Sequence, residues 1–117
     1  MRNIKEYDVF KESHKLLLKI YEITKSFPDE EKYGLVSQMR RSSYSIPMNL
    51  VEGGSLRTEK EFAHYVNIAI SSCEEIRYQL LLSKDIGYIS ENDYFHVDNN
   101  YESIKKMLYS LLKTLSQ

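Results

Sequence analysis

Apolar residues recur through most of this chain at intervals of three and four positions, which is the period of a helix that buries one face. The pattern is clearest in residues 59–86, at Phe62, Val66, Ala69, Cys73, Ile76 and Leu80. It returns after Ser90, at Tyr94, Val97, Tyr101, Ile104, Leu108, Leu111 and Leu115. Such spacing is typical of the seam between antiparallel helices in a bundle. We therefore predict two long helices that share a core.

Capping signals mark the ends of these two helices. Thr58 followed by Glu61 is a capping box, so a helix should begin there. Gly87 is predicted to end that helix in the left-handed conformation, with the next two residues packing back on the helix end. Ser90, three positions before Asp93, should begin the last helix.

The first part of the chain predicts a helix that follows a tail. Residues 1–7 are predicted to be a short N-terminal tail, and Asp8 is predicted to cap the helix that follows. Its apolar positions are Val9, Leu16, Ile20, Ile23 and Phe27. Pro28 should stop this helix, because proline has no backbone N–H to donate.

The stretch from Gly34 to Gly53 predicts a helix with two apolar faces. One stripe, expected to face the core, consists of Leu35, Met39, Ile46 and Leu50. A second group, about 160° to 220° around the helix, consists of Tyr44, Met48 and Val51. An ordinary surface helix is charged on that side, so a second burial partner is implied. We interpret this second group as a candidate oligomer interface.

A polar strip runs between the two apolar faces, at Gln38, Arg41, Ser45, Asn49 and Glu52. Pro47 lies inside the same stretch and should bend the helix between Ser43 and Pro47. Negative charge in residues 29–31 suits the start of this helix. Gly53 and Gly54 should end it, because their backbone is unhindered.

Together these stretches predict an all-α protein. Four helices joined by short connections must alternate in direction, because a short loop cannot carry the chain back along a helix. We therefore predict an antiparallel up-down-up-down four-helix bundle that forms one domain over residues 1–117. Some tyrosines fall outside the seams and suit subunit interfaces, namely Tyr44, Tyr65, Tyr78 and Tyr109.

Composition narrows the expected setting. The single Cys73 cannot form an internal disulfide, and no signal peptide or membrane-crossing apolar stretch is recognisable, so we expect a cytoplasmic protein with no membrane contact. The formal net charge of −1 is not the global basicity of a non-specific phosphate binder. Any nucleic-acid site must therefore be a local patch.

The sequence predicts no catalysis. Two pairs resemble half of a di-metal motif, Glu61 with His64 and Asp93 with His96, but both pairs should point away from the bundle interior. Cys73 lies on a core seam, where a buried thiol is the usual interpretation. Phosphate loops, nucleophile elbows and zinc signatures are absent from the sequence. We therefore expect no enzyme activity, cofactor, metal or small-molecule substrate.

Basic side chains are the remaining functional candidates. They are Arg40, Arg41, Arg57 and Lys60, carried by the second helix and the start of the third. Arginine binds phosphate well through its planar fork of donors. The alternative is that Arg41 pairs with Glu52 or Glu75 of a neighbouring helix or subunit. Lys11, Lys15 and Lys19 are interpreted as a solvated face.

The run SIPMNLVEGG, preceded by YGLVSQMRRS and followed by Arg57, Glu61 and Phe62, resembles the family of proteins encoded within intervening sequences of bacterial 23S ribosomal RNA genes. The family motif falls on Ser45, Ile46, Pro47, Asn49, Glu52 and Gly53. The likeness runs from about Tyr7 to Leu115, with Phe10 where the family would suggest tryptophan. It implies a four-helix bundle, a homo-oligomer that is commonly a pentamer, and a nucleic-acid connection based mainly on gene position.

Two functions from different classes remain. In the first, a homo-oligomer repeats its basic side chains around a ring and binds RNA or DNA by avidity. In the second, the oligomer is a protein scaffold or adaptor that contacts no nucleic acid, and its arginines are used within or between subunits.

Overall fold

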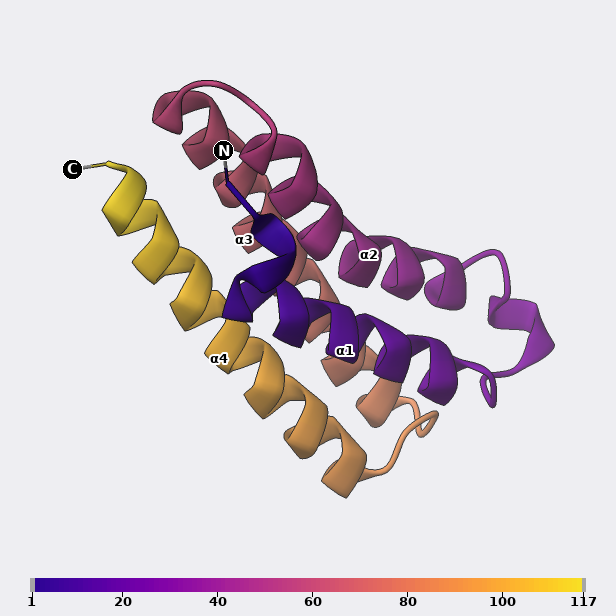
Figure 1. Cartoon of the computed structure of the whole chain (residues 1–117). Coiled ribbons are helices and arrows are strands. Elements are labelled where there is room, and N and C mark those ends of the chain that lie inside the picture. The colour runs from indigo at the N-terminus through magenta and orange to yellow at the C-terminus, as the bar shows by residue number, and fades with distance from the viewer. Residues whose placement is uncertain (1, 117) are drawn as a thin grey trace.

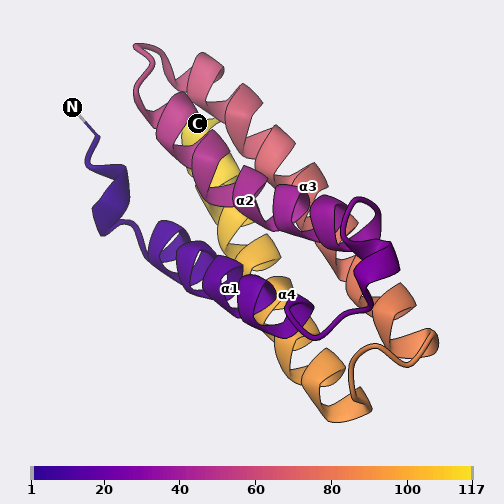
Figure 2. The same cartoon turned by 90° about the vertical axis from the view of Figure 1, so that its right-hand side faces the viewer.

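The computed structural model describes residues 2–116 and consists of four long helices. They are α1 (Asp8–Thr24), α2 (Leu35–Gly54), α3 (Glu59–Asp85) and α4 (Glu91–Leu115), with short 3-10 turns η1 (Ile4–Glu6) and η2 (Asp29–Glu31). Successive helices run in opposite directions and lie side by side (Figures 1 and 2). The predicted all-α up-down bundle is confirmed. No helix within residues 2–116 is long and apolar enough to cross a membrane.

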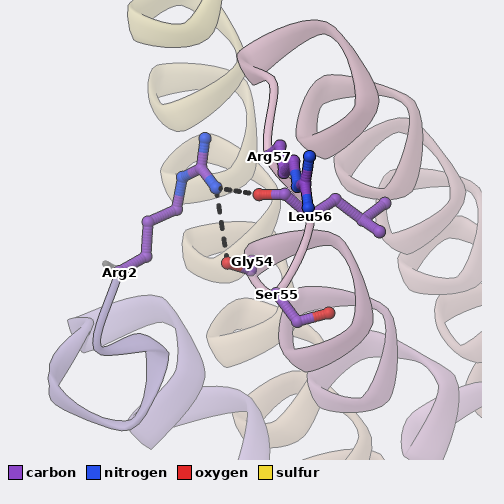
Figure 3. Close-up of a pocket in the computed structure, with 5 residues that line it drawn as sticks. All are labelled: Arg2, Gly54, Ser55, Leu56 and Arg57. Carbon is purple, nitrogen blue, oxygen red and sulfur yellow. Dashed lines mark hydrogen bonds between the residues drawn. The ribbon is translucent and has the colours of Figure 1, made fainter.

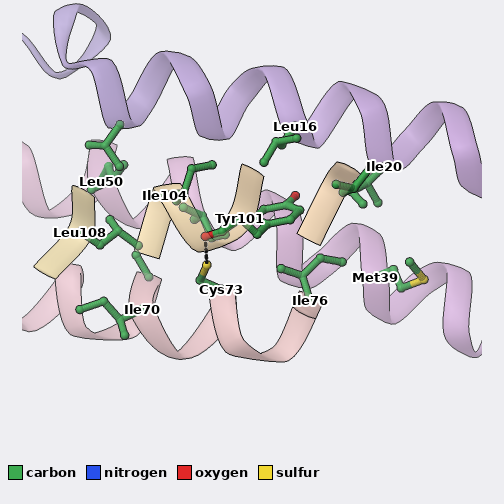
Figure 4. Packing of buried hydrophobic residues seen from close by; sticks show 14 of the residues in the cluster. Leu16, Ile20, Met39, Leu50, Ile70, Cys73, Ile76, Tyr101, Ile104 and Leu108 are labelled. Carbon is green, nitrogen blue, oxygen red and sulfur yellow. Dashed lines mark hydrogen bonds between the residues drawn. The ribbon is translucent and has the colours of Figure 1, made fainter. Parts of the chain in front are cut away.

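The core contains the seam residues that the spacing of three and four positions predicts. All six predicted seam positions of α3 are fully buried, and in α4 the same is true of Val97, Tyr101 and Leu108. Tyr94, Leu111 and Leu115 pack against this core but stay partly exposed, because they lie towards the ends of α4. Figure 4 shows side chains from all four helices meeting in this layer.

The predicted caps of α3 and α4 are also confirmed. The Thr58 side chain accepts a hydrogen bond from the Glu61 backbone N–H at 3.1 Å, and Glu61 Oε1 accepts one from the Thr58 N–H at 3.1 Å. Gly87 takes the left-handed conformation, with φ of 85°, and Tyr88 N–H then donates to the Ser83 carbonyl at 2.8 Å. Ser90 Oγ accepts from Asp93 N–H at 3.0 Å. These ends depend on local sequence alone, which is why they were predictable.

The ends of α1 differ from the prediction. Tyr7 is the N-cap residue and makes no side-chain capping bond, whereas Asp8 is already inside the helix. The helix ends at Thr24, before Pro28, because the α conformation is disfavoured for a residue that precedes proline. Phe27 is nevertheless buried, as predicted, beyond the helix end.

The segment predicted as an N-terminal tail packs on the bundle in the part that the structure describes. Residues 4–6 form the 3-10 turn η1, and Ile4 is buried in the core. Arg2 lies close to the end of α2, where it hydrogen-bonds backbone carbonyls. The segment therefore packs against the bundle at the end where α2 turns into α3 (Figure 1).

The helix α2 ends at Gly54, as predicted, but neither Gly53 nor Gly54 takes the left-handed conformation of a glycine cap, since Gly87 is the only residue with positive φ in the described chain. Their role is close packing: a Cβ on Gly53 would lie 2.6 Å from Tyr65 Cβ, and a Cβ on Gly54 would overlap Ile4. Two side chains that pack on the bare backbone of α2 therefore explain the glycine pair.

Pro47 lies inside α2 and is buried. The axis of α2 changes direction along its length in Figure 1, as expected of a helix that contains proline. Of the predicted core stripe, Met39, Ile46 and Leu50 are fully buried, whereas Leu35 at the helix start is only partly covered.

Replacing Gly53 with alanine should lower the free energy of unfolding by about 1 to 3 kcal/mol, because α2 and α3 would have to separate around the new methyl group. Urea unfolding followed by circular dichroism measures this. Asn67→Ala, at an exposed position of α3, is the matched control and should have little effect. Equal stability of Gly53→Ala and the wild type would contradict the close-packing role.

Candidate nucleic-acid and subunit interfaces

The four basic candidates do not form one patch. Arg40 and Arg41 lie near the start of α2, and Arg57 and Lys60 follow its C-terminal end. From Arg40 to Gly54 the helix rises about 20 Å at 1.5 Å per residue, so the two pairs lie near opposite ends of the bundle. Because the turn between α2 and α3 carries only Arg57, with Lys60 at the start of α3, the four cations predicted from the sequence lie on two separate parts of the surface.

Arg40 has a structural role. Its Nε donates to Thr24 Oγ1 at 3.0 Å, its Nη2 lies 3.4 Å from the Tyr21 carbonyl, and its guanidinium stands 4.5 Å from the Tyr21 ring centre. These contacts join α2 to the end of α1. Ligand binding by Arg40 would have to compete with them.

Arg41, Arg57 and Lys60 are exposed, and within the described chain none lies within 4 Å of a carboxylate oxygen. The predicted pairing of Arg41 with Glu52 or Glu75 therefore does not form inside this subunit. Lys11 and Lys19 do have partners, since they lie 3.7 Å from Glu6 and Glu22 respectively.

The sequence analysis missed Arg2. Its Nη1 donates to the Leu56 carbonyl at 2.7 Å and the Gly54 carbonyl at 3.3 Å, and its guanidinium lies 4.8 Å from the Phe62 ring centre. Figure 3 shows Arg2 reaching the end of α2, where Arg57 follows in the next turn. Both side chains line one open hollow of about 570 Å³. The only signal in the sequence was Ile4, an apolar residue in an otherwise polar segment.

The candidate oligomer face on α2 is only partly covered. Tyr44 is 47% exposed and Val51 is 41% exposed, whereas Met48 is intermediate. Tyr44 also lines a hollow of about 530 Å³ with Tyr21 of α1 and Tyr33, which is 87% exposed. Lys32, Arg40 and Arg41 line the same hollow, so the surface between α2 and the neighbouring end of α1 combines aromatic rings with cations.

Two of the five residues in the polar strip of α2, Ser45 and Asn49, make hydrogen bonds inside the subunit. Ser72 Oγ of α3 donates to Ser45 Oγ at 2.8 Å, and Asn49 Nδ2 donates to Ser45 Oγ at 2.8 Å and to the Ser45 carbonyl at 2.7 Å. Ser42 similarly lies 3.4 Å from a carboxylate oxygen of Glu75. Gln38, Arg41 and Glu52 of this side stay exposed. The motif residue Ser45 thus joins α2 to α3, and Asn49 holds the Ser45 side chain from within α2.

The two histidine pairs do not form a metal site. Glu61, His64, Asp93 and His96 are all exposed, and Glu61 is occupied in the capping box. Within residues 2–116, no three histidine, cysteine or acidic side chains are grouped so that they could hold a metal ion.

Cys73 is buried in the core, as predicted. Its Sγ donates to the Tyr101 carbonyl at 3.3 Å, and burial raises the pKa of this thiol to about 12. Burial also raises the pKa of Tyr101, whose hydroxyl has no hydrogen-bond partner in the described chain. Both groups stay protonated at neutral pH, which does not suit a nucleophile.

The protein is therefore an all-α bundle whose exposed aromatic and basic side chains lie on its surface and near its helix ends. The model of the 23S rRNA-intervening sequence protein family matches residues 5–110, and the chain belongs to that family. The predicted family resemblance is thereby confirmed.

A solved structure from Bacteroides thetaiotaomicron, described as a protein with unknown function from the S23 ribosomal protein family, is similar throughout. It has 26% sequence identity and a TM-score of 0.83, over 90% of this chain and 98% of that one. The comparison with curated proteins finds no match.

The raised pKa of Cys73 predicts a loss of stability at high pH. The thiol has a reference pKa of 9.0 and a pKa of about 12 in the folded protein, so between these values the unfolded chain releases a proton that the folded chain keeps. The free energy of unfolding should therefore fall as pH rises through this window, by up to about 1.4 kcal/mol per pH unit from this group.

Urea unfolding over this pH window measures the slope. Cys73→Ala should give a shallower slope, because the variant lacks the thiol that releases a proton on unfolding. Identical slopes would contradict this assignment.

Proposed function

We propose that this protein is a non-enzymatic homo-oligomer that binds RNA or DNA by phosphate contacts repeated around the assembly. The observation that supports it best is the combination of a partly uncovered apolar face on α2 with exposed cations that have no carboxylate partner within residues 2–116.

Self-association is supported by exposed aromatic and apolar side chains. One hollow is lined by Tyr21 of α1, Tyr44 of α2 and Tyr33 between these helices. Leu18, which like Tyr21 lies on α1, is 57% exposed. Exposed aromatic side chains of this kind suit subunit interfaces, since the ring is buried while the hydroxyl keeps a polar contact. A closed ring would bury the same surface on every subunit. The family resemblance suggests five subunits.

Nucleic-acid binding is supported by cations that make no ion pair, and not by the net charge of the chain. The net charge is only −1, so one subunit should bind weakly. Arg41, Arg57 and Lys60 are free of ion pairs in the described chain, and an oligomer multiplies them. Several weak phosphate contacts on one strand then combine by avidity.

The second candidate is a protein scaffold without nucleic acid. It is favoured by the position of Arg40, which is used to join α1 and α2. In this case Arg41, Arg57 and Lys60 would pair with carboxylates of neighbouring subunits.

The double variant Met48→Glu with Val51→Glu should be a folded monomer, because it places charge in the proposed apolar interface. Light scattering gives the mass, and circular dichroism gives the helix content. Phe95→Glu is the matched control, since Phe95 is 50% exposed near the start of α4, outside the proposed interface, and it should keep the wild-type mass. A double variant with the mass of the wild type would place the interface elsewhere.

RNA binding should weaken steeply as salt rises and depend little on base sequence. Changing Arg41, Arg57 and Lys60 together to alanine should weaken it by about tenfold or more without changing the mass. The control triple variant changes Lys11, Lys15 and Lys19, of which two already have carboxylate partners, and it should bind nearly as the wild type. Fluorescence anisotropy with a labelled single strand measures both. No binding by the wild type at low salt would leave the scaffold function.

A further inference from the structure

We infer that Arg2, Lys5 and Arg57 form a binding site for a phosphate group of a nucleic-acid strand, at the corner where the N-terminal segment packs on the end of α2. The inference rests on the proposed function and specifies where one strand phosphate is held. It adds two residues of the N-terminal segment that the sequence analysis had assigned to a tail.

The position of Arg2 is the first support. Both of its hydrogen bonds within the described chain use Nη1, to the Leu56 and Gly54 carbonyls at 2.7 and 3.3 Å. The Phe62 ring lies beneath the guanidinium, 4.8 Å away. The Nε–H and Nη2–H donors remain available, and a guanidinium already fixed in place loses little conformational freedom when it binds an anion.

The second support is the grouping of positive charge. Arg57 lines the same hollow as Arg2, and Lys5 lines an adjoining hollow of about 330 Å³ that shares Arg2, Gly54 and Ser55 with it. Within residues 2–116 none of the three cations lies within 4 Å of a carboxylate. Three positive charges thus surround the last turn of α2.

The carboxylates near this corner do not pair with its cations: Glu52 and Glu59 are exposed and make no ion pair within residues 2–116. Glu6, next to Lys5 in the chain, lies 3.7 Å from Lys11, and Glu61 is held in the capping box of α3. The carbonyls at the negative end of α2 are already satisfied in part by Arg2, which offsets the helix dipole there. The corner is therefore suited to an anion.

Phosphate is the anion that this chemistry suits. Guanidinium groups bind phosphate oxygens through pairs of parallel N–H donors, with a geometry that a single ammonium does not offer. The hollow is open and lies on the surface, so a strand can run across it while one phosphate sits between Arg2 and Arg57 (Figure 3).

The first test uses inorganic phosphate as the probe and the full chain. In ¹⁵N-resolved NMR spectra, phosphate should shift the Arg2 and Arg57 Nε–H signals, whereas chloride at the same ionic strength should not. Arg57→Gln should weaken phosphate binding by about tenfold, because one guanidinium is lost. Arg41→Gln, which removes an exposed arginine near the other end of α2, is the matched control and should bind phosphate as the wild type does.

A second variant keeps the test independent of folding defects. Gly54→Ala should displace Ile4 and with it Arg2, so it should weaken phosphate binding while Arg57 stays in place. Circular dichroism checks that both variants keep the helices. Equal shifts with chloride, or unchanged phosphate affinity in Arg57→Gln, would overturn the site.

The third test shows whether the bound phosphate belongs to the 5′ end or to the backbone of the strand. It also separates failure of this site from failure of the proposed function. A short single-stranded RNA is compared with and without a 5′-phosphate: Arg57→Gln should weaken only the phosphorylated strand if the site holds a terminal phosphate, and both strands if it holds the backbone. Stronger binding of a phosphopeptide than of either strand would overturn the assignment to nucleic acid.

RNA binding that Arg57→Gln leaves unchanged would refute this site and keep the proposed function. Phosphate binding without any RNA binding would refute the proposed function and leave only a small-anion site.

Discussion

The close approach of α2 to its neighbours at Gly53 and Gly54 is the constraint on which this structure depends most. A Cβ at Gly53 would lie 2.6 Å from Tyr65 Cβ, so the absence of a side chain sets how near α3 can come. At that separation Ser45 and Ser72 are within 2.8 Å of each other. On the other side, Gly54 admits Ile4, which brings Arg2 to the carbonyls at the helix end. One pair of small residues thus positions a helix, a segment and a surface site.

The fold could be predicted from the sequence where its signals are local or periodic. The seam of α3 repeats over six buried positions, and the Thr58 capping box and Gly87 each act within one helical turn. The glycine pair was predicted only as the end of α2, because the sequence does not show that Tyr65 and Ile4 approach it. Arg2 was missed for the same reason, since its partners lie 52 and 54 residues away.

Charge on this protein divides between side chains that hold helices together and side chains that remain available. Arg77 of α3 donates from Nε to Asp98 of α4 at 2.8 Å, and this hydrogen bond raises the pKa of Arg77 further above its usual range. Lys105 lies 3.2 Å from Glu74 across the same pair of helices. The carboxylates of Glu74, Asp98 and Glu102 are therefore matched by cations within the α3–α4 pair. Exposed cations without partners are found near both ends of α2, which a net charge of −1 conceals.

The attachment of the N-terminal segment couples the surface to local unfolding. Ile4 packs on α2 through a contact that closes a loop of some fifty residues, and η1 is a single 3-10 turn, so the segment has little structure of its own once detached. Docking of the segment strengthens anion binding by Arg2, so a bound anion stabilises the docked segment by the same coupling free energy. Slower amide hydrogen exchange in residues 4–6 would then report an occupied corner, with no need for a signal from the ligand itself.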